Sequence, residues 1–184
     1  MKKFLKYSGL IALGLVVAGF VLTMVTRAFV DKADAAANWF SGAAALFGKG
    51  PVHYSYDITW GIIHISDSYD GVWEGGASGA ALTGWIFALI SILSLAGGAV
   101  LPLLKVKLSD KVAACVNLGA VVLLITAGIV TFCSLQSFAG INDKAYMLDY
   151  YNLSFGWVLA GIFYLAAGAI AICPTVVDFI SKKK

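Results

Sequence analysis

Residues 80–104 read AALTGWIFALISILSLAGGAVLPLL, an apolar run that contains no Asp, Glu, Lys, Arg or His. A helix needs roughly 20 such residues to cross the roughly 30 Å hydrocarbon core of a bilayer, so this run is long enough. Three further runs share its composition and length: Tyr7–Thr26, Val112–Leu135 and Phe155–Val177. The first exceeds the roughly 7–15 apolar residues of a secretory signal, so we expect it to be a retained span. The sequence therefore predicts one membrane domain, residues 1–184, with four transmembrane helices.

The charged residues all lie between or outside these four runs. The chain of 184 residues contains 13 Lys and Arg and 10 Asp and Glu, and 60% of it is hydrophobic. Lysines gather at the N-terminus, after the second run and in the tail, at Lys2, Lys3, Lys6, Lys105, Lys107, Lys111, Lys182, Lys183 and Lys184. Positive charge favours the cytoplasmic side of a membrane. We therefore expect both termini to be cytoplasmic, residues 27–79 to form a long external loop, and the protein to lie in the cell membrane.

The predicted spans lack the groups that most membrane chemistry requires. Proton-coupled transport needs an ionisable side chain near the bilayer centre, and haem-binding bundles need histidines within their helices. Both histidines, His53 and His64, lie in the external loop. His53 and Asp57 are roughly 14 Å apart in an extended chain, which is too far for one metal ion. We therefore expect no enzymatic activity, no cofactor, no metal site and no nucleic-acid partner.

The external loop carries one helical and one extended pattern. Aromatic residues and alanines recur every four positions before Gly48, which predicts a short helix over Asp31–Phe47. Residues 52–60 alternate in polarity and predict a strand, and a second strand is expected at 62–66, followed by a polar turn at Asp67–Gly71. Together these segments predict a small antiparallel sheet on the outer membrane face. We expect its buried core to consist of Tyr54, Tyr56, Ile58, Trp60 and Trp73.

Small and polar side chains within the spans indicate how the helices pack. Small residues allow helix backbones to approach closely in lipid, where no hydrophobic force drives association. They recur at packing intervals as Gly14, Ala18, Gly156, Ala160, Gly161, Ala167, Gly168 and Ala171. Asn117 is polar and lies at membrane depth, so we expect it to hydrogen-bond to another helix. Aromatic residues at the outer ends of the spans, including Tyr151 and Trp157, are typical of an interfacial belt.

Two motifs resemble those of the claudin and peripheral-myelin-protein superfamily. Trp60 followed by Tyr69-Asp70-Gly71-Val72-Trp73 is similar to the family's tryptophan and Gly-Leu-Trp motif, and Tyr151–Trp157 resembles the entry to its fourth span. The resemblance implies four spans, with a first external loop that forms a small sheet over the bundle. The chain departs from the family because it lacks the paired loop cysteines and the outer arginine of the second span. The helix predicted over Asp31–Phe47 is additional.

The expected fold class is therefore an all-α membrane protein, a four-transmembrane-helix bundle with a small extracellular β-sheet formed by the long first loop. The resemblance implies a non-enzymatic protein that acts by lateral self-assembly, as a homo-oligomer, or as an accessory subunit of a membrane complex. Its partners would be the lipid bilayer and either a second copy or another membrane protein, bound by the external loop. The alternative is an oligomeric channel with a pore between subunits, because four apolar spans alone offer no polar path.

Overall fold

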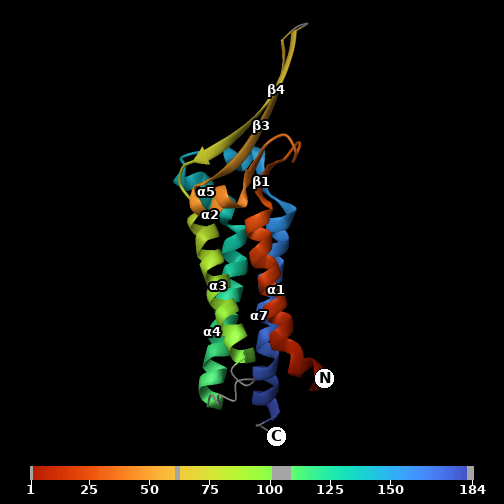
Figure 1. The fold of residues 1–184 in the computed structure, drawn as a ribbon, viewed down its shortest axis with the longest axis vertical. Helices are drawn as coiled ribbons and strands as arrows, with labels where there is room; N and C mark the ends of the chain where they lie inside the picture. Colours follow the sequence, from red (N-terminus) through yellow and green to blue (C-terminus); the bar gives the residue numbers. More distant parts are fainter. Residues whose placement is uncertain (1, 61–62, 101–108, 182–184) are drawn as a thin grey trace. The chain divides into compact units, whose positions relative to one another are not determined.

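Four long apolar helices dominate the protein, as the sequence predicts. The computed structural model describes residues 2–60, 63–100 and 109–181. The long helices are α1 (Lys2–Val25), α3 (Gly79–Val100), α4 (Asp110–Phe132) and α7 (Phe155–Ser181), and they run side by side (Figure 1). Each contains a window of 19 to 23 residues with the length and hydropathy of a membrane span. A small antiparallel sheet accompanies them, so this coarse architecture is confirmed.

The ends of these helices differ from the predicted spans. Helix α4 ends at Phe132, and a separate helix, α5 (Ser134–Ile141), begins two residues later, whereas the sequence indicated a span to Leu135. Helix α7 continues through Pro174 to Ser181. Hydropathy marks the part of a helix that suits lipid, but the helix itself ends where capping and local hydrogen bonding end it. Residues 101–104 of the predicted second span, and the lysines at positions 105, 107 and 182–184, lie outside the described residues.

Contacts divide the chain into two compact units. The helical unit comprises Met1–Val21, Gly84–Ile129 and Leu159–Lys184, and the sheet unit comprises Leu22–Thr83 and Val130–Val158. In the helical unit, small residues from all four long helices surround the buried side chains of Val16, Leu124 and Tyr164. Close approach of α1 to α7 depends on Gly19, where an added Cβ would lie 2.8 Å from the Tyr164 ring and 3.2 Å from the Ala160 carbonyl oxygen.

Several of the predicted packing residues lie in this core, and others do not. Ala160, Ala167 and Ala171 are buried, as is Gly161, and Gly168 packs against Ile125 of α4. Ala18 is half-buried, and a Cβ added to Gly14 would meet no atom within 4 Å. Gly156 belongs to the sheet unit, where it packs against Thr26. The spacing thus identifies small residues but not which of them meets a neighbouring helix, since that depends on how each helix is rotated.

Asn117 forms the predicted interhelical hydrogen bond. Its side-chain amide donates to the Ala171 carbonyl oxygen at 2.8 Å and to the Thr175 hydroxyl at 3.3 Å, which links α4 to α7. In α3, the Ser91 hydroxyl lies 2.8 Å from the Phe87 carbonyl oxygen of the preceding turn. These bonds satisfy polar groups that would otherwise lack partners in an apolar environment.

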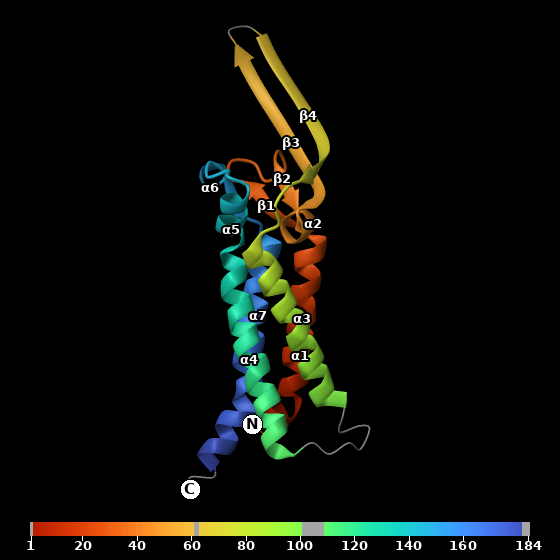
Figure 2. The same cartoon turned by 90° about the vertical axis from the view of Figure 1, so that its left-hand side faces the viewer.

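The sheet unit contains a five-stranded antiparallel sheet in the order β4-β3-β2-β1-β5. Its strands are β1 (Arg27–Asp31), β2 (Trp39–Ser41), β3 (Lys49–Trp60), β4 (Ile63–Glu74) and β5 (Tyr151–Leu153). Three short helices, α2 (Gly42–Phe47), α5 and α6 (Met147–Tyr150), also belong to the unit. The first connection therefore supplies four strands and the last supplies the fifth. Strands β3 and β4 have 12 residues each and are much longer than the other three, and Figure 2 shows the contrast with β1 and β2.

The predicted helix over Asp31–Phe47 is wrong except for its last six residues. The Ser41 hydroxyl caps α2 by accepting the Ala44 N–H at 3.2 Å, and Gly48 ends the helix in the left-handed conformation, with φ of 70°. Upstream, the Asp31 carboxylate accepts the Ala33 N–H at 2.7 Å and holds a turn between β1 and β2. Asp and Ser favour such local bonds over a helix interior, which explains the shorter helix.

The predicted polar turn at Asp67–Gly71 is also wrong, because these residues are part of β4. The first strand is confirmed and begins earlier, at Lys49, while the second extends well beyond Ser66 to Glu74. The ladder is unbroken from Lys49↔Glu74 to Trp60↔Ile63, with Gly71 opposite Val52. Pairing along a long partner strand thus overrides the turn preference of Asp, Ser and Gly.

We predict that Gly19→Leu lowers the thermal stability of the purified protein, because the new side chain would collide with the buried Tyr164 ring and the α7 backbone. Overpacking of this kind costs roughly 1–3 kcal/mol. Gly14→Leu adds the same side chain to the same helix at a position where an added Cβ has no atom within 4 Å. This substitution should leave the unfolding temperature nearly unchanged. Equal effects of the two substitutions would contradict the packing of α1 on α7.

Candidate functional site

An aromatic cluster centred on Phe40 forms the core of the sheet unit. The Phe40 side chain is only 2% exposed. Five rings surround it at centroid separations of 5.3–6.3 Å: Phe29, Tyr54, Trp73, Phe138 and Tyr151. These rings come from β1, β3, β4, α5 and β5. The cluster therefore holds the first and last connections of the chain against each other.

The sequence identified only the edge of this cluster. Trp73 was predicted to be a core residue and contacts both Phe40 and Phe138, and Tyr54 also contacts Phe40. The sequence pattern places Phe40 in a helix, whereas it lies in β2. The pattern also places Tyr151 and Trp157 in a membrane-interface belt, whereas both are buried. The missed signal was the run of aromatic and β-branched residues around Phe29 and Phe40, which is typical of strands.

Polar side chains connect the same two parts of the chain. The Asn142 side chain accepts the Gly76 N–H at 2.7 Å and donates to the Gly76 carbonyl oxygen at 3.0 Å. The Ser78 hydroxyl donates to the Ser134 carbonyl oxygen at 2.9 Å. The Ser154 N–H donates to Ala28 at 2.9 Å, which ties the start of α7 to β1. These bonds join residues far apart in the sequence, as a disulfide would in a loop that contained cysteines.

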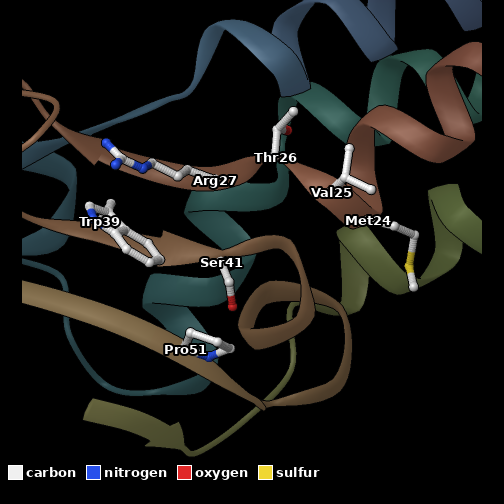
Figure 3. Close-up of a pocket in the computed structure, with 7 residues that line it drawn as sticks. All are labelled: Met24, Val25, Thr26, Arg27, Trp39, Ser41 and Pro51. Carbon is white, nitrogen blue, oxygen red and sulfur yellow. The ribbon is translucent and has the colours of Figure 1, made fainter. Parts of the chain in front are cut away.

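A pocket opens where α1 passes into β1. Its cavity volume is about 340 Å³, and it is lined by Met24, Val25, Thr26, Arg27, Trp39, Ser41 and Pro51 (Figure 3). The Arg27 guanidinium lies 4.7 Å from the centre of the Trp39 ring. Its Nη1 also donates to the Ala35 carbonyl oxygen at 2.9 Å. A cation is thus held in a fixed orientation beside exposed apolar residues.

The distal part of β3 and β4 forms a two-stranded ribbon. Strand β2 pairs with β3 only at Val52 and His53, so from Tyr54 and Tyr69 outward the two strands pair only with each other among the described residues. Side chains alternate between the two faces of such a ribbon. Tyr69 and Ile65 therefore share the face of Tyr54, and Figure 2 shows this part extending beyond β2. Asp67, opposite Tyr56, lies on the same face. We call the exposed Tyr56, Ile65 and Tyr69 the apolar ribbon face.

The apolar ribbon face continues the buried core into solvent. Val52 is buried and Tyr54 is half-buried, whereas Tyr56 is 46%, Ile65 52% and Tyr69 64% exposed. The predicted core is therefore wrong at Tyr56, although the predicted face is right. The side chains of Ile58 and Trp60, the remaining members of that prediction, lie outside the described residues. Alternation in sequence identifies a face but does not reveal how far that face is covered.

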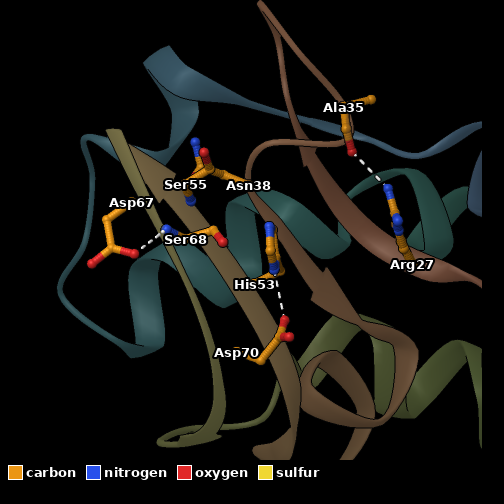
Figure 4. A network of polar contacts seen from close by, with 8 residues as sticks. All are labelled: Arg27, Ala35, Asn38, His53, Ser55, Asp67, Ser68 and Asp70. Carbon is orange, nitrogen blue, oxygen red and sulfur yellow. Dashed lines mark hydrogen bonds and ion pairs between the residues drawn. The ribbon is translucent and has the colours of Figure 1, made fainter. Parts of the chain in front are cut away.

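The opposite face of the hairpin is polar, with two cross-strand pairs. His53 Nδ1 lies 2.6 Å from an Asp70 carboxylate oxygen, and His64 Nδ1 lies 3.1 Å from one of Asp57 (Figure 4 shows the first pair). The Asn38 side chain accepts the Ser55 N–H at 3.0 Å, which attaches the turn after β1 to β3. Within the described residues, no three His, Cys, Asp or Glu side chains gather as metal ligands would.

Burial also affects the tyrosines of the cluster. Burial, with smaller contributions from Tyr54, Asp31 and Tyr146, raises the pKa of Tyr151 to about 12. Burial also raises the pKa of Tyr54, and Tyr146 adds to that shift. Both phenols are therefore more easily deprotonated in the unfolded chain than in the folded protein.

We predict that Phe40→Ala destabilises the protein strongly, because it removes the ring that all five neighbours contact. Such truncations of buried aromatics cost roughly 3–5 kcal/mol. Tyr69→Ala removes a ring of similar size from the exposed ribbon and should cost far less. Thermal unfolding of the purified protein, followed by tryptophan fluorescence, compares the two variants. Similar unfolding temperatures for both would contradict the assignment of Phe40 to the core.

A second prediction concerns alkaline pH. The raised pKa of Tyr151 gives a contribution to stability that is complete below its ordinary pKa of about 10 and is lost as the pH rises through about 12. Tyr151→Phe cannot ionise, so its stability should fall less than that of the unmodified chain between these pH values. Unfolding temperatures measured at pH 8, 10 and 11.5 test this difference. Parallel losses in both proteins would show that Tyr151 does not contribute.

Comparisons of this chain with protein-family models, with curated proteins and with solved structures found no match.

Proposed function

We propose that this chain is a claudin-like integral membrane protein that acts without catalysis, by lateral assembly with its own copies or as an accessory subunit of a membrane complex. The four apolar helices support membrane insertion, because their outward-facing side chains are themselves apolar, including Leu10, Leu93, Val122 and Ile162. A helix that is apolar on all sides is suited to lipid. Polar side chains of these helices, such as Asn117 of α4 and Ser91 of α3, form hydrogen bonds within the helical unit.

The apolar ribbon face is the observation that carries the proposal of association. A two-stranded hairpin is marginally stable in water unless its apolar face is covered. Three large apolar or aromatic side chains nevertheless lie exposed on this face. Strand β4 is also at the end of the sheet, so its outer edge offers unpaired backbone groups to another chain. A partner that covered the face and the edge would bury the exposed apolar side chains and supply hydrogen bonds to the unpaired backbone groups.

The charge distribution supports one orientation. Lysines accumulate at both termini and after the second span, which favours placing these segments in the cytoplasm. The sheet unit would then lie outside the cell, and the membrane would be the cell membrane. In this orientation the apolar ribbon face is available to chains in the same or in a facing membrane.

The claudin resemblance supports the same proposal. The layout that it implied includes a small sheet formed by the first long connection, and four of the five strands here come from that connection. Trp73, the last residue of the resembling motif, packs against Phe40 and Phe138. Hydrogen bonds from Asn142 and Ser78 would take over the role of the family's missing loop cysteines.

We predict that Ile65→Lys disrupts this association. A membrane-impermeant amine cross-linker applied to intact cells should link the unmodified protein to a second copy or to another membrane protein. Burying a new ammonium group on the apolar ribbon face should reduce the linked fraction roughly fivefold or more, because removing a charge from water costs well over 1 kcal/mol. The reagent reaches only the outside, so the same experiment tests the orientation of the sheet.

Ser66→Lys is the matched control. It adds the same amine to the neighbouring position of β4, on the opposite, polar face, and should leave the linked fraction unchanged. Equal losses in both variants would place the interface elsewhere. A chain that yields no cross-linked product in native membranes and purifies as a monomer would overturn the proposal of association.

A further inference from the structure

The pocket at the junction of α1 and β1 combines one cation with an apolar wall. Met24 and Val25 are the last residues of α1, and Val25 is 72% exposed. Arg27 follows two residues later, and Trp39 of β2 lies beneath its guanidinium (Figure 3). The apolar wall therefore belongs to the end of a candidate membrane span, and the cation lies just beyond that end. A ligand that filled the pocket would need an apolar part next to an anionic part.

The Arg27 side chain is oriented but not neutralised. Among the described residues, its hydrogen-bond acceptor is the Ala35 carbonyl oxygen, and no described carboxylate forms an ion pair with it. A guanidinium has five N–H donors in a planar fork, so most of its donors remain available. Such a fork matches the geometry of phosphate oxygens, and stacking on an aromatic ring limits the entropy lost on binding.

The location selects a lipid over a soluble anion. The end of a span lies at the boundary between hydrocarbon and headgroups, where arginine and tryptophan side chains are favoured. A phospholipid placed there would direct its phosphate to Arg27 and its acyl chain along Met24 and Val25. A choline group would gain little from Trp39, since the Arg27 guanidinium already lies over that ring. The arrangement therefore favours an anionic headgroup over a zwitterionic one.

We propose that this pocket binds the phosphate of an anionic phospholipid through Arg27, with Met24 and Val25 against its acyl chain. The inference rests on the membrane insertion in the proposed function but not on self-association. Bound in this way, the lipid would attach the strand pair β1 and β2 to the headgroup layer. A binding site for lipid would thus lie in the same unit as the apolar ribbon face.

The test titrates the purified full-length protein, in neutral detergent, with phosphatidylglycerol and follows its unfolding temperature. A ligand that binds only the folded state raises this temperature, and the stabilisation grows with the logarithm of 1 + [L]/Kd, where [L] is the free ligand concentration. Phosphatidylglycerol should stabilise the unmodified protein more than phosphatidylcholine does, and Arg27→Ala should weaken its apparent affinity about tenfold. Arg27→Lys should retain part of the affinity, because it keeps the charge and loses the fork. Lys49→Ala removes a cation of the same unit outside the pocket and should bind normally.

A second pair of variants leaves Arg27 in place. Val25→Asp puts a carboxylate in the apolar wall of the pocket and should abolish the stabilisation by phosphatidylglycerol, whereas Val25→Ser should preserve it. Inorganic phosphate at the same concentration should have no effect. Equal stabilisation by inorganic phosphate would show that the pocket binds a soluble anion and not a lipid. An unchanged stabilisation by phosphatidylglycerol in Arg27→Ala and Val25→Asp would overturn the proposed site. Specific binding by a protein that never self-associates would support this inference while contradicting the association proposal.

Discussion

The packing of five rings around Phe40 is the interaction on which the sheet unit depends. Strand β2, which carries Phe40, is only three residues long and pairs with β3 at two positions. Backbone hydrogen bonds alone would hold so short a strand weakly. The Phe40 ring contacts residues from β1, β3, β4, α5 and β5. These side-chain contacts hold β2 in place, although the strand forms few backbone hydrogen bonds. Loss of the ring would release two distant connections together.

Hydrogen bonds between the first and last connections fix backbone positions that the apolar packing alone would leave less precisely defined. Aromatic contacts tolerate small rotations, whereas the two bonds between Asn142 and Gly76 fix one backbone position. The Ser154 N–H bond to Ala28 does the same for β1 and the start of α7. The described cysteines, Cys133 of this unit included, are free thiols, and a few half-buried or buried polar groups therefore define the geometry of the sheet. The bond from the Ser55 N–H to the Asn38 side chain does the same at the base of the ribbon, beyond which Tyr56, Ile65 and Tyr69 lie exposed.

The sequence predicted the elements whose signal is local and missed those that depend on distant residues. The four apolar runs were recognised because composition alone determines which segments suit lipid. The alternation at residues 52–60 likewise predicted β3. Strands β1 and β2 were missed because they are short and because β1 pairs with β5, more than 100 residues away. The Arg27 pocket joins the end of α1 to Trp39, and nothing in the local sequence indicated that β1 and β2 would bring Arg27 and Trp39 together.

The unbroken ladder of the hairpin also sets a rule for changes in its length. Because side chains alternate, the loss or gain of one residue in one strand would exchange the two faces beyond that point and turn the polar pairs toward the aromatic side. The gain or loss of two residues in each strand would preserve both faces and change the reach of the ribbon by about 7 Å. The length of the ribbon is thus adjustable in steps of two residues in each strand, with the Phe40 cluster left intact at each step.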